Sequence, residues 1–438
     1  MGKIEIVRQL DLDKFMNIGI QTWGSEGDIN PFIALASGLS KAGHSVTLAI
    51  TSADRKDFKN ISEQLEFKLS TVDYIGENEE ALNNLGKKMI EISNPLAQLK
   101  FIYKEMFQPC VESIFKTSQS LCNKNDLVIG HFIHHPLQTA VEKAGKPYIS
   151  VTLNHGALPT KYSPPGQFPN LGEWFNLLFW KLSEKMMNDI LLPYINVLRG
   201  NNGLNKVKSF RRVWESPLCN LIAVSPILCE PRKDWGINNH ICGFFKMDEN
   251  VNKWNMPENL ETFLISGTAP VYMTLGSMTG TENNLLIINE TTRLLFDAAK
   301  LAGCRAVIQS RWENVNGIPE DENIFRVNSS PYMKVFPKCG AVVHHGGAGT
   351  TQSATISGCP SIIIAHIQDQ FLWGMELNRL GIGGKTLNRR NVTSKKIAQE
   401  IRSVLKNKYM AENAMIIGKK LKNEDGVKNA VKIIENIL

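Results

Sequence analysis

The stretch His344-His345-Gly346-Gly347-Ala348-Gly349-Thr350-Thr351 decides the fold of the C-terminal half of this chain. It follows the apolar run 341–343 and precedes a helix-like run, 351–357, that ends at Gly358. A strand, a glycine-rich turn and a helix start together present unpaired backbone N–H groups and the positive end of a helix dipole to an anion. The stretch therefore predicts a cradle for a diphosphate.

This cradle differs from the best-known phosphate-binding loops. Its glycines do not follow the GxGxxG spacing, and no lysine follows them as in a P-loop. Glycine lets the backbone approach a phosphate closely, while a hydroxyl of Thr350 or Thr351 and a histidine ring can add hydrogen bonds. Because glycine-rich turns before helices are common, the turn alone leaves phosphate binding and a purely structural turn as equal alternatives.

Two polar residues follow the next predicted strand. The apolar run 362–365 is typical of a buried parallel strand, and Asp369 and Gln370 come shortly after it. Open α/β sheets bind ligands at the carboxyl ends of their strands. A carboxylate beside an amide offers the acceptors and donors that sugar hydroxyls require, so the pair predicts a sugar-binding position.

The run from His344 to Gly381 resembles the sugar-donor region of the UDP-glycosyltransferases, in the branch of sterol and lipid glucosyltransferases and of macrolide and glycopeptide antibiotic glycosyltransferases. The resemblance implies an α/β protein of the GT-B fold, with two Rossmann-like domains facing each other across a cleft and a C-terminal helix crossing back to the N-terminal domain. It also implies that His345 and Thr350 contact the diphosphate, and that Asp369 and Gln370 hold the sugar.

Other segments extend this resemblance. The run 270–278 looks like the first strand of the donor half with its Gly-Ser turn, which implies that Ser277 reaches phosphate. In relatives the region 325–337 contacts the nucleobase, mostly through backbone, and Val327 is expected to take this part. For Trp312 and Tyr332 two alternatives remain: the ring stacks on the base, or it packs inside the protein. The glycines expected on the donor side are Gly27, Gly347 and Gly349.

The N-terminal segment Gly24-Ser25-Glu26-Gly27-Asp28 follows a strand predicted over 17–20 and precedes a helix with Pro31 in its first turn. It resembles the opening motif of the same family, usually Gly-Ser-Arg-Gly-Asp, with Glu26 where arginine is usual. The resemblance implies that Asp28 is the general base that takes the proton of the acceptor hydroxyl. From position alone Asp28 instead caps the helix, and the two roles can coexist.

The acceptor side is expected between residues 84 and 203. The run 168–187 is rich in bulky apolar residues and is typical of a helix that lines an apolar acceptor pocket, rests on a lipid surface or packs in a core. Its acceptor-side candidates are Trp174, Phe175 and Phe179.

Histidines supply further acceptor-side candidates, namely His131, His135 and His155. The spacing of the run His131-Phe132-Ile133-His134-His135 leaves zinc binding and a catalytic base as alternatives. No acidic or cysteine partner lies near this run in the sequence, so we expect no metal site.

Length and composition agree with a two-domain enzyme. With 438 residues and 43% hydrophobic residues, the chain can bury two cores. We expect an acceptor-binding domain over 1–240, a linker over 241–268, a nucleotide-sugar-binding domain over 269–420 and a final helix over 421–438 that packs on the first domain. A net charge of +7 without a nucleic-acid-reading motif argues against a nucleic-acid partner.

The same composition bears on location. No apolar run reaches membrane-spanning length, and the mixed, charged residues 1–15 do not predict a signal peptide. Eight cysteines without metal-like spacing indicate reduced thiols. We expect a cytoplasmic monomer or weak dimer, with peripheral membrane contact as an alternative.

The predicted function is inverting, metal-independent transfer of a hexose, expected to be glucose, from a UDP-sugar to a hydroxyl of an apolar acceptor such as a sterol, polyketide or flavonoid-like molecule. No cofactor is expected besides the sugar-nucleotide substrate. Two alternatives stay open: a nucleotide-sugar epimerase of the same architecture, and a non-catalytic protein that binds sugar nucleotides or lipids. The products distinguish the three, because only the transferase forms a new glycoside.

Overall fold

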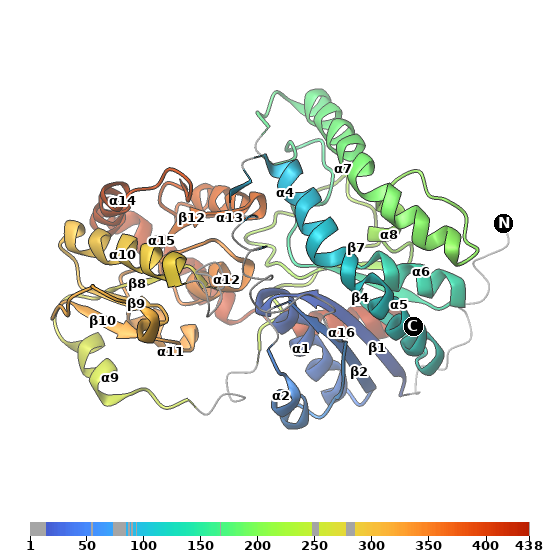
Figure 1. Cartoon of the computed structure of the whole chain (residues 1–438), viewed down its shortest axis with the longest axis horizontal. Helices are drawn as coiled ribbons and strands as arrows, with labels where there is room; N and C mark the ends of the chain where they lie inside the picture. The colour runs from blue at the N-terminus through green and yellow to red at the C-terminus, as the bar shows by residue number, and fades with distance from the viewer. Residues whose placement is uncertain are drawn as a thin grey trace. The chain divides into compact units, whose positions relative to one another are not determined.

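The chain folds into two compact units, each built on its own parallel β-sheet (Figure 1). The computed structural model describes residues 15–53, 56–72, 85, 88, 91–92, 94–166, 168–247, 254–276 and 285–437. The first unit comprises Met1–Gly76, Leu99–Val251 and Asp425–Leu438, and the second comprises Glu77–Gln98 and Asn252–Glu424.

Within the described residues, the first unit contains seven parallel strands in the order β3-β2-β1-β4-β5-β6-β7. Its inner strands are buried along nearly their whole length, as expected for a sheet covered by helices on each side, whereas the edge strands β3 and β7 are partly exposed. Register is set by long pairings, for example Asn17 to Gly24 of β1 against Ser45 to Ser52 of β2. The strands are β1 (Asn17–Gly24), β2 (Ser45–Ser52), β3 (Lys68–Thr71), β4 (Leu127–His131), β5 (Tyr148–Thr152), β6 (Cys219–Ile222) and β7 (Asn239–Ile241).

Helices cover both faces of this first sheet. One face packs on α1 (Glu26–Lys41), α2 (Lys59–Gln64) and α16 (Gly426–Ile437). The other face packs on the apolar sides of α5 (Val111–Lys124) and α6 (His135–Ala144). The remaining helices and helical turns of this region are α4 (Pro95–Phe101), η2 (Ile102–Phe107), η3 (Gln108–Cys110), α7 (Glu173–Asn201) and α8 (Arg211–Trp214).

The last helix, α16, returns to the first unit, as the family resemblance implied. Ala430, Val431 and Ile434 lie in the same apolar core as the inner side of α1. The two helices approach closely because α1 carries Gly38 at the crossing, where any added Cβ would collide with Val427. The C-terminal helix is therefore a structural part of the N-terminal unit.

The described part of the second unit contains six parallel strands in the order β10-β9-β8-β11-β12-β13. Its two core layers lie on opposite faces of the sheet, one against α10 and α14 and the other against α9, α11 and α12. The strands are β8 (Val271–Thr274), β9 (Ala306–Gln309), β10 (Ile324–Val327), β11 (Ala341–His344), β12 (Ser361–Ala365) and β13 (Leu387–Asn388). The helices and helical turns are α9 (Glu258–Ile265), α10 (Leu285–Ala302), η6 (Trp312–Asn314), α11 (Tyr332–Val335), η7 (Phe336–Lys338), α12 (Ala348–Ile356), α13 (Gln368–Arg379), α14 (Ser394–Lys406) and α15 (Lys408–Lys422).

The two sheets share the doubly wound strand order 3-2-1-4-5-6, extended by β7 in the first unit. In such sheets the order reverses between the first and fourth strands, and ligands bind outside the carboxyl ends of the strands at that point. The reversal lies between β1 and β4 in the first unit and between β8 and β11 in the second. The fold therefore places one candidate site in each unit.

Two expectations about boundaries differ from the structure. The helix predicted to have Pro31 in its first turn starts earlier, at Glu26, so Pro31 lies in the second turn of α1, where its missing N–H leaves the Gly27 carbonyl without its helical partner. The stretch 241–268 is not a linker throughout. Phe245 belongs to the first core and α9 packs in the second, while 248–253 lies outside the described residues.

Candidate functional site

The turn between β11 and α12 requires glycine at Gly346. Its φ is +89°, and a Cβ placed there would lie 2.8 Å from Ile363 Cγ2 and 3.1 Å from Gln370 Cβ. The first distance is shorter than side-chain carbons tolerate and the second is shorter than most such contacts, so the turn packs directly against the end of β12 and the start of α13. This close approach brings Gln370 beside the turn.

The ring of His345 lies against two further glycines. A Cβ on Gly347 would collide with His345 Nε2, and one on Gly276 would lie 2.8 Å from His345 Cε1. The ring therefore occupies the carboxyl ends of β8 and β11, next to the N-terminus of α12. Burial lowers the pKa of His345 to about 4, so the ring is neutral at pH 7 and has one N–H to donate. Its Nδ1 is buried without a hydrogen-bond partner among the described residues.

The neighbouring His344 has a different position. Its Nδ1 accepts a hydrogen bond from Gly346 N at 3.1 Å, which places the ring proton on Nε2. The side chain is fully buried, and burial lowers its pKa to about 3. His344 therefore holds the turn, while His345 is the ring at the helix start.

The N-terminus of α12 has the properties of an anion site. Gly347 is its N-cap residue, no side chain caps the helix, and no acidic residue lies in its first turn. The first helical hydrogen bond runs from Thr351 N to Gly347 O, so the N–H groups of 348–350 have no acceptor within the helix. The helix dipole adds partial positive charge at the same place. Thr350 occupies the third position of this turn.

The Asp-Gln pair lies in the first turn of α13. Gln370 Oε1 accepts hydrogen bonds from His366 N at 2.6 Å and from Ile367 N at 3.3 Å. The amide oxygen is therefore occupied by the backbone, and the amide N–H groups are the part of Gln370 that can donate to a ligand. Asp369 is half-buried in the same turn.

The expected nucleobase region shows packed aromatic rings. Trp312 donates its indole N–H to Ile308 O at 2.9 Å, and the Arg326 guanidinium lies 4.5 Å from the ring centre. Tyr332 stacks on Phe336 with ring centres 4.6 Å apart. Each ring thus has a protein partner on one face, which favours packing over base stacking.

Val327 and Ser277 were both expected to bind the sugar donor at strand ends, and the structure describes only the first of them. Val327 ends β10, is 9% exposed, and accepts a hydrogen bond from Ser310 N at 3.0 Å. Ser277 lies outside the described residues, so its predicted contact with phosphate stays a prediction.

Three residues at this edge of the second sheet were missed from the sequence. Gly276 has a φ of +56° and makes room for the His345 ring, and His366 supplies the N–H that holds Gln370. Arg389 follows β13, donates to Thr291 Oγ1 at 3.2 Å, and has a pKa lowered by burial. His366 directly follows the predicted strand 362–365 and could have been found from it, whereas no strand was predicted before Arg389.

In the first unit, Asp28 caps its own helix. Its Oδ2 accepts hydrogen bonds from Ser25 N at 3.0 Å and from Ser25 Oγ at 3.2 Å. Gly24 is required behind it, because with a φ of +140° any added Cβ would collide with the Asp28 carboxylate. The capping role weighed from the sequence is therefore present, and it places a half-buried carboxylate at the carboxyl end of β1, beside the exposed Gly27.

The unusual Glu26 has a partner in the same unit. Its carboxylate accepts a hydrogen bond from Lys56 Nζ at 2.5 Å, and both side chains are about half exposed. Lys56 comes from the loop after β2, next in the sheet to β1. Lys56 brings a cation near the loop, and Glu26 neutralises it, so the pair carries no net charge.

The histidines after β4 are buried in an aromatic cluster. His131 lies 5.5 Å from the Phe32 ring centre and His135 lies 5.8 Å from that of Phe107. Burial lowers the pKa of His131 and of His135 to about 3 and that of His134 well below its ordinary value. Because a ring with so low a pKa is a weak base at neutral pH, the alternative of a catalytic histidine here is disfavoured.

The aromatic candidates of α7 do not join this cluster. Trp174 and Phe175 are 68% and 43% exposed and contact each other edge to face, while Phe179 stacks on Phe168. Within the described residues no ring contact connects them to His131 or His135. His155 is half-buried in the loop after β5.

Two kinds of feature are absent from the described residues. No group of three or more His, Cys, Asp or Glu side chains is arranged to hold a metal ion there. No helix in the same part of the chain combines the length and apolar character needed to cross a membrane.

Comparison with known proteins identifies the class. Residues 299–436 match a protein family described as Erythromycin biosynthesis protein CIII-like, C-terminal domain. The whole fold is similar to the solved glycosyltransferase of kitacinnamycin, with a TM-score of 0.68, 18% identity, and coverage of 97% of this chain and 100% of that one. The glycosyltransferase VinC in complex with dTDP is similar with a TM-score of 0.63 and 18% identity, over 96% and 99% of the two chains. The chain has the fold of the GT-B glycosyltransferases.

Sequence relatives narrow the family. O-mycaminosyltylonolide 6-deoxyallosyltransferase of Streptomyces fradiae is 28% identical, over 96% of this chain and 97% of that protein. Sterol 3-beta-glucosyltransferase UGT80A2 of Arabidopsis thaliana is also 28% identical, over 95% of this chain. The chain spans 65% of that plant protein and 35% of a Saccharomyces cerevisiae sterol 3-beta-glucosyltransferase. Over nearly its whole length the chain is therefore similar to glycosyltransferases that act on macrolides and sterols, and its C-terminal part matches a glycosyltransferase-type family model.

Proposed function

We propose that this protein transfers a hexose, glucose, from UDP-glucose to a hydroxyl group of an apolar acceptor, with inversion at the anomeric carbon and without a metal ion. The observation that carries the proposal is the uncapped N-terminus of α12 with the neutral His345 ring beside it. The relatives named for transfer to a macrolide and to sterols support an acceptor of that apolar class.

The donor is held by the second unit. The N–H groups of 348–350 and the ring N–H of His345 donate to the diphosphate, and the amide of Gln370 donates to a sugar hydroxyl. These donors stabilise the charge that develops on the departing diphosphate, which is the part a divalent cation plays in other transferases. The proposal therefore needs no cofactor.

The acceptor hydroxyl is activated by the first unit. As its oxygen attacks the anomeric carbon, the proton passes to the Asp28 carboxylate, and the bond from the anomeric carbon to the diphosphate oxygen breaks. Hydrogen bonds from Ser25 N and Ser25 Oγ both end on Asp28 Oδ2 and fix the carboxylate at the start of α1. Capping and proton transfer are thus compatible roles of one side chain.

The location proposed is the cytoplasm. None of the eight cysteines forms a disulfide, and burial raises the pKa of Cys122 to about 11 and of Cys219 to about 12. Such thiols are protonated and unreactive at neutral pH, which suits a reducing compartment.

Asp28→Asn and Ser25→Ala form a matched test of the catalytic step. Asparagine keeps an oxygen that accepts from Ser25 N but cannot take a proton, so turnover should fall about 10²- to 10⁴-fold while UDP binding and thermal stability are retained. Ser25→Ala removes one hydrogen bond to Asp28 and should cost about 0.5–1 kcal/mol of stability with turnover retained. Near-normal turnover of Asp28→Asn would exclude Asp28 as the base.

The donor is tested by thermal stability with UDP, dTDP and their sugars, with and without EDTA. At about 100 times its dissociation constant, the true ligand should add roughly 2.7 kcal/mol. A shift with UDP that EDTA leaves unchanged agrees with the proposal, a shift with dTDP alone corrects the nucleotide, and a shift that EDTA abolishes contradicts the metal-free site. Product analysis then separates a new glycoside from an epimerised sugar.

A further inference from the structure

The N-terminal half of α7 (Glu173–Asn201) is attached to the first unit by polar bonds. Asn176 Nδ2 donates to Lys161 O and to Asn170 Oδ1, both at 2.9 Å, and Trp180 Nε1 donates to Ser163 O at 2.9 Å. Asn176 and Trp180 are 1% and 8% exposed, so they form the inner side of the helix. An ordinary surface helix buries an apolar stripe instead.

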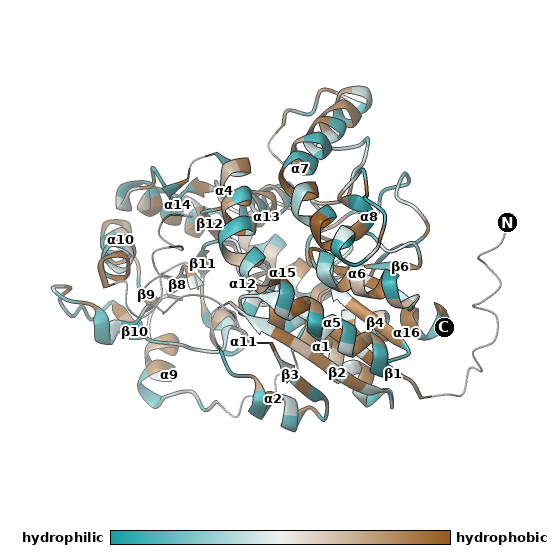
Figure 2. Cartoon of the chain, turned by 45° about the vertical axis from the view of Figure 1, so that its right-hand side comes forward, coloured by the Kyte–Doolittle hydropathy of each residue, from teal (hydrophilic) through white to brown (hydrophobic). Residues whose placement is uncertain are grey.

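The outer side of the same half is apolar. Its large side chains are between 43% and 68% exposed, although burying each of them would release water from apolar surface. Figure 2 shows hydrophobic segments on α7, which extends away from the first sheet in Figure 1. We call this surface the α7 apolar face, and it comprises Leu171, Trp174, Phe175, Leu177, Leu178 and Leu182.

Two exposed lysines share this face. Spacings of three and four residues place Lys181 and Lys185 on the same side of the helix as Trp174 and Leu178. The acidic residues of this half are paired elsewhere: Glu173 Oε2 lies 2.9 Å from Lys161 Nζ, and Glu184 contacts Ser209 and Arg211 on the inner side. The outer side therefore combines apolar surface with net positive charge.

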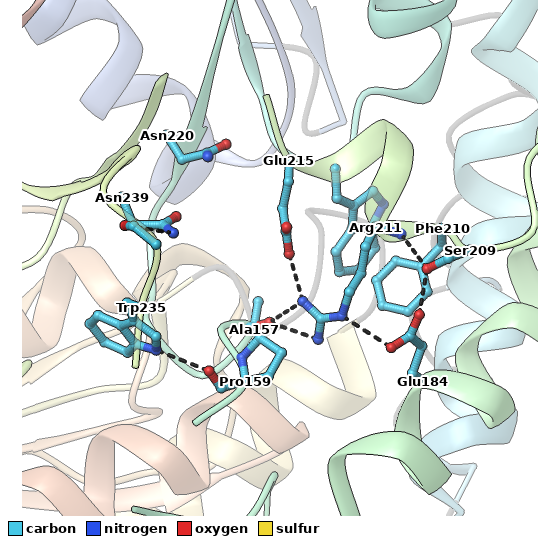
Figure 3. Close-up of polar contacts among 12 residues, drawn as sticks. Ala157, Pro159, Glu184, Ser209, Phe210, Arg211, Glu215, Asn220, Trp235 and Asn239 are labelled. Carbon is cyan, nitrogen blue, oxygen red and sulfur yellow. Dashed lines mark hydrogen bonds and ion pairs between the residues drawn. The ribbon is translucent and has the colours of Figure 1, made fainter. Parts of the chain in front are cut away.

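The inner side is fixed by an arginine network (Figure 3). Arg211 Nη1 donates to Glu215 Oε1 at 2.7 Å and to Ala157 O at 3.4 Å, and Arg211 Nε lies 3.5 Å from Glu184 Oε2. Ser209 Oγ donates to the other oxygen of Glu184 at 2.5 Å. Glu184 thus connects the middle of α7 to α8 and to the loop after β5.

The C-terminal end of α7 is anchored as well. Arg199 is 2% exposed and donates to both carboxylate oxygens of Glu142 on α6, at 2.9 and 3.0 Å. A bidentate pair of this kind is geometrically specific. The helix is thus attached to its unit at its middle and at its C-terminal end. The α7 apolar face points outward and is not part of a hydrophobic core of the first unit.

We propose that the α7 apolar face docks on the surface of an anionic lipid bilayer, with Trp174 and the leucines at the level of the acyl chains and Lys181 and Lys185 at the headgroups. Tryptophan and lysine are the side chains that suit this interface, because each has an apolar body and a polar end. A second copy of the chain fits less well, since a two-fold contact on this face would bring both pairs of lysines together without acidic partners. The surface requires neither sugar donor nor acceptor and so stands apart from the proposed transfer reaction.

The test is co-sedimentation of the full chain with phosphatidylcholine vesicles containing about one-third phosphatidylglycerol, compared with pure phosphatidylcholine. The wild-type protein should bind the anionic vesicles, and raising the salt from about 0.1 M to 0.5 M should weaken the binding. Trp174→Ser/Leu178→Ser should lower the partition coefficient at least about tenfold. Lys181→Glu/Lys185→Glu should remove the preference for anionic lipid.

Ile265→Ser/Leu286→Ser is the matched control, because these side chains are 69% and 74% exposed in the second unit. It should leave vesicle binding unchanged, and thermal stability of every variant should stay near that of the wild type, since only exposed positions are altered. Failure of the wild-type protein to bind, or equal losses in the control, overturns the proposal. A concentration-dependent dimer in light scattering that Trp174→Ser/Leu178→Ser abolishes would show that a second copy covers the face instead.

Discussion

The turn after β4 and the turn after β11 occupy the same topological position in two sheets of the same strand order, yet they lead into their helices in different ways. Both follow a strand that ends in a buried histidine, His131 in the first unit and His344 in the second. Histidine content therefore does not distinguish them. The difference lies in the residues that lead from the strand into the helix.

After β11 the chain enters α12 through Gly346 and Gly347, so backbone N–H groups are accessible at the helix start. After β4 it enters α6 through His134 and His135, and Pro136 occupies the second position of the helix. The rings of Tyr103 and Phe107 lie within 6 Å of the His135 ring. Glycine exposes one helix terminus to a ligand, while aromatic packing covers the other.

The largest expected effect comes from filling the glycine turn. Gly347→Ala should lower kcat/KM and the affinity for UDP about 10²- to 10³-fold, because its Cβ would collide with His345 Nε2 and displace the ring from the helix start. Gly200→Ala is the control for folding, since its Cβ meets no protein atom within 4 Å and it lies in the first unit. Steady-state kinetics and UDP titration measure both. Equal behaviour of the two variants would show that the position of the His345 ring is unimportant.

Acid should destabilise both turns alike. Each has three neighbouring buried histidines with lowered pKa values: His131, His134 and His135 in the first unit, and His344, His345 and His366 in the second. The unfolded chain, with an ordinary histidine pKa near 6.5, binds more protons than the folded one, so the stability is present above about pH 6.5 and is lost as pH falls.

Between pH 6.5 and 5.5 the loss should be roughly 1 kcal/mol for each ring, or about 3 kcal/mol for each group of three. Urea unfolding at these two pH values, with hydrogen exchange of peptides from β4–α6 and β11–α12, measures it. A stability that stays flat across this range would mean that the rings are hydrogen-bonded to ordered water or already charged.

Replacing one histidine in each turn sharpens the comparison. His345→Gln should weaken UDP binding about 10- to 100-fold, because a donor at the start of α12 is displaced. His131→Gln should leave UDP affinity unchanged, because His131 lies in the other unit. Since the pKa of His345 is about 4, wild-type UDP affinity should show no titration of this ring between pH 6 and 8. Equal losses in the two variants would contradict the assignment.

The smallest effect concerns the interior of the first cluster. His134 is fully buried, and neither ring nitrogen has a hydrogen-bond partner among the described residues. His134→Leu should therefore be neutral or stabilise the protein by about 1 kcal/mol at pH 7.5, because two unpaired buried polar atoms are removed. Thermal unfolding measures this. A loss of more than about 1 kcal/mol would indicate that the ring binds buried water in the folded protein.

The sequence alone predicted the parts that depend on local pattern. The apolar runs 341–343 and 362–365 were predicted as strands and are β11 and β12 in the structure. The prediction was possible because hydrophobic periodicity and the glycines of turns are local properties of the sequence. The resemblance carried by 344–381 predicted the two-sheet fold and the return of the last helix, both confirmed by the structure and its relatives.

The tertiary structure decided how individual side chains are used. His344 accepts a hydrogen bond from Gly346 N, and this bond leaves His345 as the histidine at the helix start. The side-chain oxygen of Gln370 is occupied because it accepts a hydrogen bond from His366 N. Neither follows from spacing along the chain. The start of α1 was misplaced for the same reason, since the bonds between Ser25 and Asp28 extend the helix before Pro31.

The outward position of Trp174 and the burial of His131 show most clearly what a sequence pattern cannot predict. Both residues lie in runs whose composition fits a core, a pocket or a surface equally well, and a sequence pattern specifies which residues share a side of an element. Which side meets water depends on what packs against it from distant parts of the chain. For α7 that is the loop 161–170 with Arg211, and for β4 it is Phe32 and Phe107. The sequence determined the elements and their order, and long-range packing determined which of their side chains meet solvent.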